Sequence, residues 1–200
     1  MKILIIILAA VMLVIFIIQK VMAAANAKLE RQAYRLVSRD GKFELRDYPS
    51  AVMATVHSSG NGEGRSENSN FRRLAGYIFG GNETSAKISM TAPVHMGRTD
   101  VGSTMQFVMP SQYKLEDLPK PLDPSISFSM SDSGQYAAVI FGGFTNPEKI
   151  LEKEHELADW LKMRNLDIIG PFEVLGYNPP YELVDRRNEI LVKVVERKNM

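Results

Sequence analysis

Three histidines, His57, His95 and His155, are the side chains most able to bind a metal or carry a proton. None is three or four residues from another, so no single helix or strand supplies a two-histidine metal site. His155 follows Leu151 by four residues, beside the apolar stripe of a predicted helix, which favours a core or boundary position. His95 stands at the end of a predicted strand.

No set of side chains in the sequence resembles a catalytic site. The carboxylates of Glu152, Glu154 and Glu156 are plentiful, but their pattern is typical of the solvated face of a helix. There is no Gly-x-Ser-x-Gly elbow. The chain has no cysteine, which excludes disulfides, thiolate metal sites and a cysteine nucleophile. These features favour binding over catalysis.

The glycine-rich segment 60–65 is similar to a dinucleotide fingerprint. The fingerprint requires glycine where Arg65 stands, and it lies between a parallel strand and a helix. Here the flanking elements are predicted hairpins, which favours a flexible connection.

Methionine is abundant, with eleven residues in the chain. Four of them, Met90, Met96, Met105 and Met109, lie on two neighbouring predicted strands. Methionine packs into irregular apolar space and adapts to flat ligands. The pattern therefore suits ordinary core packing or an adaptable apolar cleft.

Composition suits one globular domain. The chain has 200 residues, of which 45% are hydrophobic, and its formal net charge is +1. Proteins that bind nucleic acid usually show a strong basic excess, so no nucleic-acid partner is expected.

The N-terminal segment, residues 1–25, is expected to be a transmembrane anchor or a signal peptide. Residues 3–18 carry no charge, and small residues at 23–27 offer cleavage sites. A membrane-anchored or exported protein is therefore expected, with the extracytoplasmic side favoured. Residues 26–40 are predicted to be a polar linker and residues 41–197 a folded domain.

The rest of the chain alternates strands and helices. Residues 87–96 form the central predicted strand, with alternating apolar side chains and a break at Pro93. An amphipathic helix that ends at Gly80 and Gly81 precedes it. The predicted elements are a hairpin at 43–57, a helix at 67–79, strands at 87–96 and 104–109, a hairpin at 126–144, a helix at 147–163, and strands at 172–177 and 189–195.

This order repeats once, as hairpin, helix, interrupted strand and strand. Two such units bury their sheet faces by closing against each other. We therefore predict an α+β fold, a distorted antiparallel β-barrel of about eight strands with two flanking helices and a pseudo-twofold ββαββ repeat.

Six motifs resemble the SOUL haem-binding protein family over roughly residues 34–196. In this sequence they are Phe43-Glu44-Leu45-Arg46-Asp47-Tyr48, Asn82, Lys87-Ile88-Ser89-Met90-Thr91-Ala92-Pro93-Val94, Phe107-Val108-Met109-Pro110, Gly176-Tyr177-Asn178-Pro179-Pro180 and Arg187-Asn188-Glu189. The resemblance implies the same barrel and binding of haem or another porphyrin, which folding does not require.

A porphyrin is a flat apolar disc with two carboxylates on one edge, so it suits an apolar groove with cations at the rim. The implied binding residues lie on the first helix and the adjoining sheet edge: Arg72, Arg73, Leu74, Tyr77, Lys87, Met90 and His95. A surface helix that shows its arginines to water explains the same pattern.

The chain departs from the family at one position. Some members have a histidine, proposed as an axial iron ligand, just before the tyrosine that ends the first strand. Asp47 stands there, before Tyr48. Carboxylate is a poor haem ligand beside imidazole, so weaker binding with less preference for iron is expected.

Three functions remain open. The first is non-enzymatic binding of haem or a related tetrapyrrole. The second is a general module for binding or sensing amphiphilic small molecules or lipids. The third is an enzyme that removes the metal from a tetrapyrrole.

Overall fold

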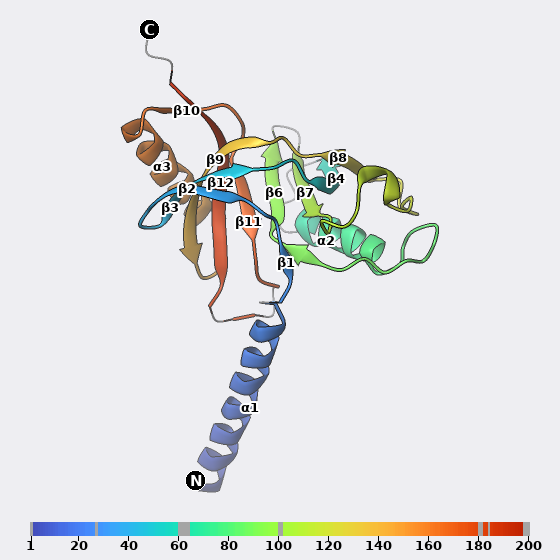
Figure 1. Ribbon diagram of the computed structural model, residues 1–200. Coiled ribbons are helices and arrows are strands. Elements are labelled where there is room, and N and C mark those ends of the chain that lie inside the picture. Colours follow the sequence, from blue (N-terminus) through green and yellow to red (C-terminus); the bar gives the residue numbers. More distant parts are fainter. Residues whose placement is uncertain are drawn as a thin grey trace.

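The computed structural model describes residues 2–26, 28–59, 65–99, 102–179, 182–183 and 185–197. They form a mixed α+β body built on one large antiparallel sheet (Figure 1). Helices α2 (Arg65–Ile78) and α3 (Pro147–Met163) pack against this body, and α1 (Lys2–Asn26) projects away from it.

The large sheet has ten strands, ordered β2-β3-β9-β12-β11-β6-β7-β4-β8, with β10 paired to β12. A separate parallel pair joins β1 (Glu30–Arg31) to β5 (Thr91–Ala92). The strands of the large sheet are β2 (Arg35–Asp40), β3 (Phe43–Tyr48), β4 (Val52–Ser59), β6 (Val94–Thr99), β7 (Gly102–Val108), β8 (Ile126–Met130), β9 (Gly134–Gly142), β10 (Leu166–Ile168), β11 (Glu173–Gly176) and β12 (Arg187–Glu196).

The predicted closed barrel is wrong. Over the described part of the chain, the hydrogen-bonded order runs from β2 to β8 without joining these two edges. The reason lies in the predicted linker, 26–40, which contains β1 and β2. Strand β2 pairs with β3 and so occupies the edge where closure would have to occur.

The two predicted hairpins are also wrong, although their strands exist. β3 pairs with β2 and β9, whereas β4 pairs with β7 and β8. In the same way, β8 and β9 lie far apart in the sheet order. Residues 52–56 of β4 are all buried, so both faces of this strand need cover that a two-stranded hairpin cannot give.

The predicted strand at 87–96 is shorter in the structure. It is divided by Pro93 into β5 and β6, as the proline indicated, but residues 87–90 are not in a strand. Ile88 is nevertheless buried, and its backbone N–H donates to the Ile78 carbonyl at the end of α2. The alternating apolar pattern therefore marks packing against α2 rather than strand pairing.

Helix α3 confirms the predicted range 147–163. Its cap is Asn146, whose Oδ1 accepts from the Lys149 backbone N–H at 2.8 Å. Leu157, Trp160 and Leu161 on its inner face pack against β9 and β12. On the other half of the sheet, Leu74, Tyr77 and Ile78 of α2 pack against β4 and β7.

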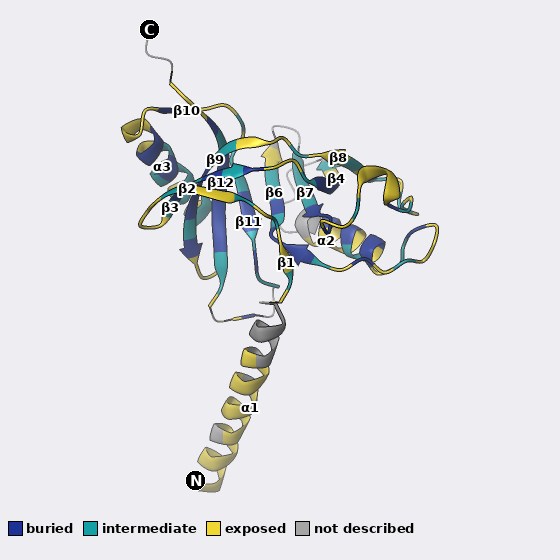
Figure 2. Ribbon diagram, viewed as in Figure 1, coloured by how far each residue is buried: buried dark blue, intermediate teal, exposed yellow. Residues whose placement is uncertain are grey.

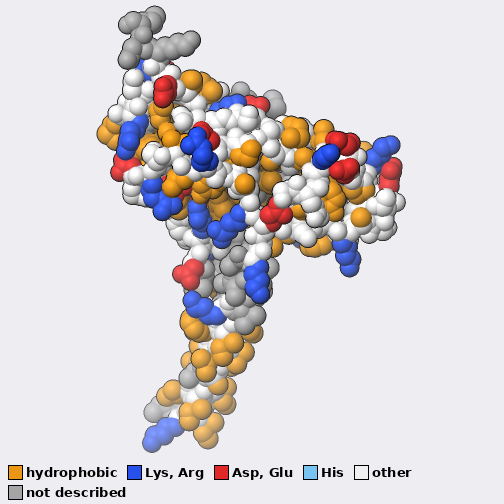
Figure 3. Space-filling view, viewed as in Figure 1, with side chains coloured by type: hydrophobic (Ala, Val, Ile, Leu, Met, Phe, Trp, Pro, Cys, Tyr) orange, Lys and Arg blue, Asp and Glu red, His pale blue; other side chains and the backbone are white. Residues whose placement is uncertain are grey.

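Helix α1 exposes apolar side chains along its length, whereas the body buries most of its own (Figure 2). Figure 3 shows the same contrast, with charged side chains of both signs scattered over the body. Within the ranges described above, no helix meets the length and hydropathy needed to cross a membrane.

Five side chains of alternating charge, called here the buried charge chain, cross the sheet. It runs Arg39, Glu44, Arg46, Glu189, Arg187, and its three central members are fully buried. Arg46 donates from Nε to Glu44 Oε2 and from Nη1 to Glu189 Oε2, both at 2.6 Å. These contacts join β3 to β12 across β9.

Tyrosines complete this buried charge chain. Tyr48 Oη accepts from Arg46 Nη1 at 3.0 Å, and Tyr177 Oη donates to Glu189 Oε2 at 3.1 Å. The Arg46 guanidinium also lies 4.3 Å from the ring centroid of Tyr34. Burial raises the pKa of Tyr48 to about 12, and raises the pKa of Tyr177 further, so both phenols stay protonated and neutral.

Replacing Arg46 tests the importance of the buried charge chain. Arg46→Met leaves Glu44 and Glu189 buried without their shared cation, so we expect the free energy of unfolding to fall by about 3–5 kcal/mol. Urea denaturation measures this loss. Arg197→Met, which removes the exposed ion pair with Asp167, should cost far less, because solvent screens that pair. Equal losses for both variants would contradict the prediction.

Acid stability gives a second prediction. Burial raises the pKa of Glu44, but the charges and hydrogen bonds of Arg46 and Arg39 together outweigh it and hold the pKa below its ordinary value of 4.5. The folded state therefore binds fewer protons than the unfolded state, and Glu44 contributes stability above pH 4.5 that is lost as the pH falls through the folded pKa. Glu44→Gln should flatten this decline in urea midpoints measured from pH 6 to acid. An unchanged profile in this variant would exclude Glu44 as the source.

Candidate functional site

The cations predicted on α2 lie on its outer side. Arg72 and Arg73 are exposed, and Arg73 Nε lies 3.8 Å from Asp123 Oδ2. Their predicted apolar neighbours are inside the core, where Leu74 is 0% and Tyr77 1% exposed. Tyr77 Oη donates to the Pro119 carbonyl at 3.0 Å, and burial raises its pKa to about 12.

Lys87 and Met90 are not brought together with these two arginines around one described cavity. Lys87 is exposed, and Met90 is half-buried against the core beneath α2. Of the seven residues implied by the resemblance, His95 lines a cavity between the strands of the sheet. That the seven bind a cofactor together stays a prediction.

His95 lies on β6 and is 5% exposed. Its Nδ1 lies 2.8 Å from Glu173 Oε2 on β11, because β6 and β11 are paired neighbours. Its Nε2 lies 2.8 Å from Gln32 Oε1, on the segment that follows β1. Both ring nitrogens are therefore engaged.

His95 borders a cavity of about 300 Å³, called here the histidine cavity. It lies among β6, β8, β9, β11 and β12, and its lining mixes aromatic, charged and amide groups. These include Gln32, Tyr48, His95, Tyr136, Glu173 and Lys193.

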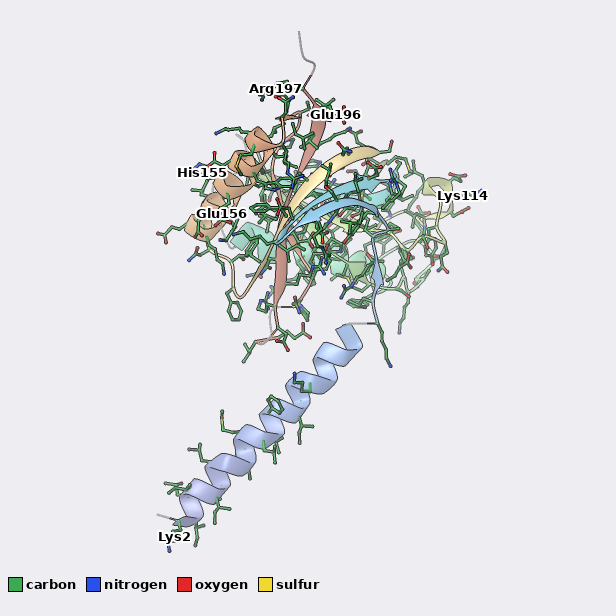
Figure 4. All side chains as sticks on the ribbon, turned by 60° about the vertical axis from the view of Figure 1, so that its left-hand side comes forward. Lys2, Lys114, His155, Glu156, Glu196 and Arg197 are labelled. Atoms are coloured by element: carbon green, nitrogen blue, oxygen red, sulfur yellow. The ribbon has the colours of Figure 1, made fainter. Side chains whose placement is uncertain are left out.

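A larger hollow, about 590 Å³, lies beside it and is called here the apolar groove. Its buried apolar lining includes Val52, Val108 and Met109, and more exposed parts of the lining include Leu115 and Met130. Four charged residues also line it: Glu30, Arg31, Lys114 and Glu116. Figure 4 shows Lys114 at the outer edge of the body, away from His155 and Glu156 on α3.

The two hollows share a wall. Gln32 and Met130 line both of them. Gln32 is held by its backbone N–H, which donates to the Ala92 carbonyl at 2.9 Å, and by its side-chain contact with His95. A ligand in the apolar groove would therefore lie next to the residue that covers His95.

Comparison with known proteins identifies the family. The model of the SOUL heme-binding protein family matches residues 29–193. The chain belongs to this family. It is 30% identical over 165 residues to heme-binding protein 2 of Mus musculus, covering 75% of this chain and 77% of the relative. It is 27% identical over 173 residues to heme-binding protein 1 of Xenopus laevis, covering 81% and 90%.

Solved structures show the same fold at low sequence identity. An uncharacterized conserved protein from Listeria innocua has a TM-score of 0.61 at 10% identity, covering 79% of this chain and 94% of that chain. The C-terminal domain of EcmrR has a TM-score of 0.54 at 10% identity, covering 77% and 97%. At this identity the likeness concerns the fold alone.

The structure gives several family motif residues a structural role. Glu44, Arg46, Tyr48 and Glu189 all belong to the buried charge chain or contact it. Asn82 accepts from the Ala86 backbone N–H and donates to the Tyr77 carbonyl, which holds the turn after α2.

Sequence reasoning missed the groove residues Arg31 and Lys114. Both lie in stretches predicted to lack regular structure, a linker and a proline-rich connection. No periodic signal marks such positions.

Proposed function

We propose that this protein binds haem or a related tetrapyrrole in the apolar groove, without chemical turnover. The observation that carries the proposal is an apolar hollow of about 590 Å³ lined also by two cations, Arg31 and Lys114. Known small-molecule sites span about 300–1,000 Å³, so the groove is of suitable size. The family and the names of its relatives support the choice of ligand.

The charges around the groove suit a ligand with carboxylates on one edge. Arg31 has its guanidinium carbon 5.8 Å from the ring centroid of Tyr177, which limits its orientations. The Glu30 carboxylate accepts from the Ser111 backbone N–H at 2.8 Å, so part of its charge is already compensated. Glu116 opposes an anionic ligand, which is consistent with modest affinity.

The outer face of α2 is the competing site. Arg72, Arg73 and Lys87 supply three exposed cations there. The groove is favoured because Leu74 and Tyr77, the apolar partners expected on that helix, are buried in the core and offer no surface to a flat ligand.

Paired charge reversals distinguish these two sites. Arg31→Glu with Lys114→Glu should weaken haemin binding at least tenfold, because two charge-assisted contacts become repulsive. Arg72→Glu with Arg73→Glu should change the dissociation constant less than threefold. Titration followed by the Soret band and by Trp160 fluorescence measures both constants.

The same titration can also contradict the proposed site or the proposed function. A loss confined to the α2 double variant would move the site to that helix. If no protein, including the unmodified chain, shifts the Soret band of haemin, the proposed function fails. Circular dichroism of each variant checks that the fold is retained.

A broader carrier for amphiphilic molecules is the second candidate. Met109 and Met130 line the groove, and thioether side chains adapt to ligands of different shape. Equal competition between haemin and unrelated apolar dyes would favour this function. Release of metal by substoichiometric protein would instead establish a metal-removing enzyme.

We also propose an exported or membrane-associated setting. The support is the uncharged segment 3–18, whose described side chains are exposed on α1. Contiguous exposed apolar surface of this kind suits contact with lipid or a translocation machinery. In cells, the full chain should fractionate with membranes or outside the cytoplasm, whereas a chain starting at residue 28 should stay cytoplasmic. Identical fractionation of the two would refute this setting.

Finally, we propose that the domain is a pseudo-twofold duplication of a ββαββ unit. The support is the strand order β3-β9-β12-β11-β6-β7-β4-β8. Assigning β3, β4, β6 and β7 to one unit and β8, β9, β11 and β12 to the other makes this order symmetric about the β11–β6 pair. Superposition of the two units tests it, and a poor fit of α2 onto α3 would overturn it.

A further inference from the structure

We infer that His95 is a latent axial ligand for the metal of a bound tetrapyrrole, covered by Gln32 and oriented by Glu173. The inference rests on the proposed function, and it adds that Gln32 controls access to His95. Three observations carry it: the carboxylate on one ring nitrogen, the displaceable amide on the other, and the shared wall between the two hollows.

The first observation is the pairing of His95 Nδ1 with Glu173 Oε2 at 2.8 Å. An ionised carboxylate can only accept, so Nδ1 is the donor. Histidines that bind metals usually donate their other ring N–H to a carboxylate or carbonyl, which fixes the ring and makes the free nitrogen more basic. Glu173 places His95 in this arrangement, with Nε2 as the nitrogen available for a metal.

The second observation is that Gln32 covers this nitrogen. Its Oε1 lies 2.8 Å from Nε2, and Gln32 itself follows the two-residue strand β1. Both residues of β1 are exposed, and their pairing with β5 spans two residues. A pair of strands this short has little stability by itself. Moving Gln32 aside therefore breaks few contacts.

The third observation is the position of Gln32 between the histidine cavity and the apolar groove. A ligand that fills the groove contacts Gln32 directly and can displace its amide. Because Gln32 Oε1 can only accept, Nε2 carries the proton of that contact. Displacement of the amide would let this proton pass to water and leave the Nε2 lone pair able to hold a metal, so no other reactant is needed.

Other side chains are less suited to this role. Asp47, at the position where some relatives have histidine, is paired with Arg35. Asp132 lies 2.7 Å from Lys193 Nζ. Met130 lines both hollows, and its thioether sulfur could compete with His95 for the metal. The experiment therefore includes a variant at Met130.

The experiment uses the full chain and ferric haemin. Gln32→Ala should bind haemin about tenfold more tightly than the unmodified chain, and its absorption and electron paramagnetic resonance spectra should shift toward a six-coordinate low-spin form. Gln32→Ala with His95→Gln should lose both effects, and Gln32→Ala with Met130→Leu should keep them. The matched control, Gln32→Ala with His155→Ala, changes an exposed histidine on α3 and should behave as Gln32→Ala alone.

The positioning role of Glu173 has its own readout. Glu173→Gln in the Gln32→Ala protein should lower the iron–histidine stretching frequency of the ferrous form in resonance Raman spectra, since the imidazole becomes less basic. An unchanged frequency would refute that role. If His95→Gln does not fold, His95→Gly with added imidazole replaces it, and restored low-spin spectra support ligation.

Metal-free protoporphyrin IX separates the two proposals. It has no metal to ligate, so every variant at Gln32 and His95 should bind it within about threefold of the unmodified chain. The inference is overturned if haemin binds to Gln32→Ala and to Gln32→Ala with His95→Gln and gives identical spectra in both. The proposed function would then remain intact. Failure of all variants to bind either porphyrin would overturn the function itself.

Discussion

The fold depends on the neutralisation of a buried cation. Arg46 lies fully inside the sheet between Glu44 and Glu189, and Arg39 and Arg187 extend the alternation of charges to the surface. Desolvating any one of these groups alone would cost several kcal/mol. The geometry therefore requires β3 and β12 to stand at a fixed distance on either side of β9. Ala138 of β9 lies directly opposite Glu44, and its small side chain leaves room for the long side chains of Glu44 and Arg46.

This constraint also positions the functional surfaces. Tyr48 receives a hydrogen bond from Arg46 and lines the histidine cavity, and Tyr177 contacts Glu189 while its ring faces Arg31 beside the apolar groove. The buried charge chain thus supports the inner wall of one hollow and one rim residue of the other. Residues that hold the ligand need not themselves belong to the family motifs, because the motifs keep the surrounding sheet in place.

The two hollows differ in what they can hold. The apolar groove is large, with two cations beside an apolar floor. The histidine cavity is half that volume, and it contains a carboxylate-backed imidazole. Gln32 separates them, and it lies on the short segment between α1 and the large sheet. In the arrangement we propose, ligand binding in the groove and access to His95 are linked through this one side chain.

The sequence by itself determined the two helices that pack on the sheet, most of the strands, the boundaries of α3, the proline break between β5 and β6, and the family. These are local features: a cap, a helical apolar stripe, a proline without an N–H, and motifs in a recognisable order. It missed β1, β2 and β10.

The sequence did not determine strand pairing. Alternation shows that a strand has two unlike faces, but it does not say which distant strand lies beside it. On β3 the more buried face carries Glu44, Arg46 and Tyr48 rather than Phe43 and Leu45. The polar face of β3 can be the buried one because charges from β3 and β12 neutralise each other, a contact between residues 143 positions apart. The candidate site was decided in the same way, since Gln32, His95 and Glu173 come together only when β1, β6 and β11 have assembled.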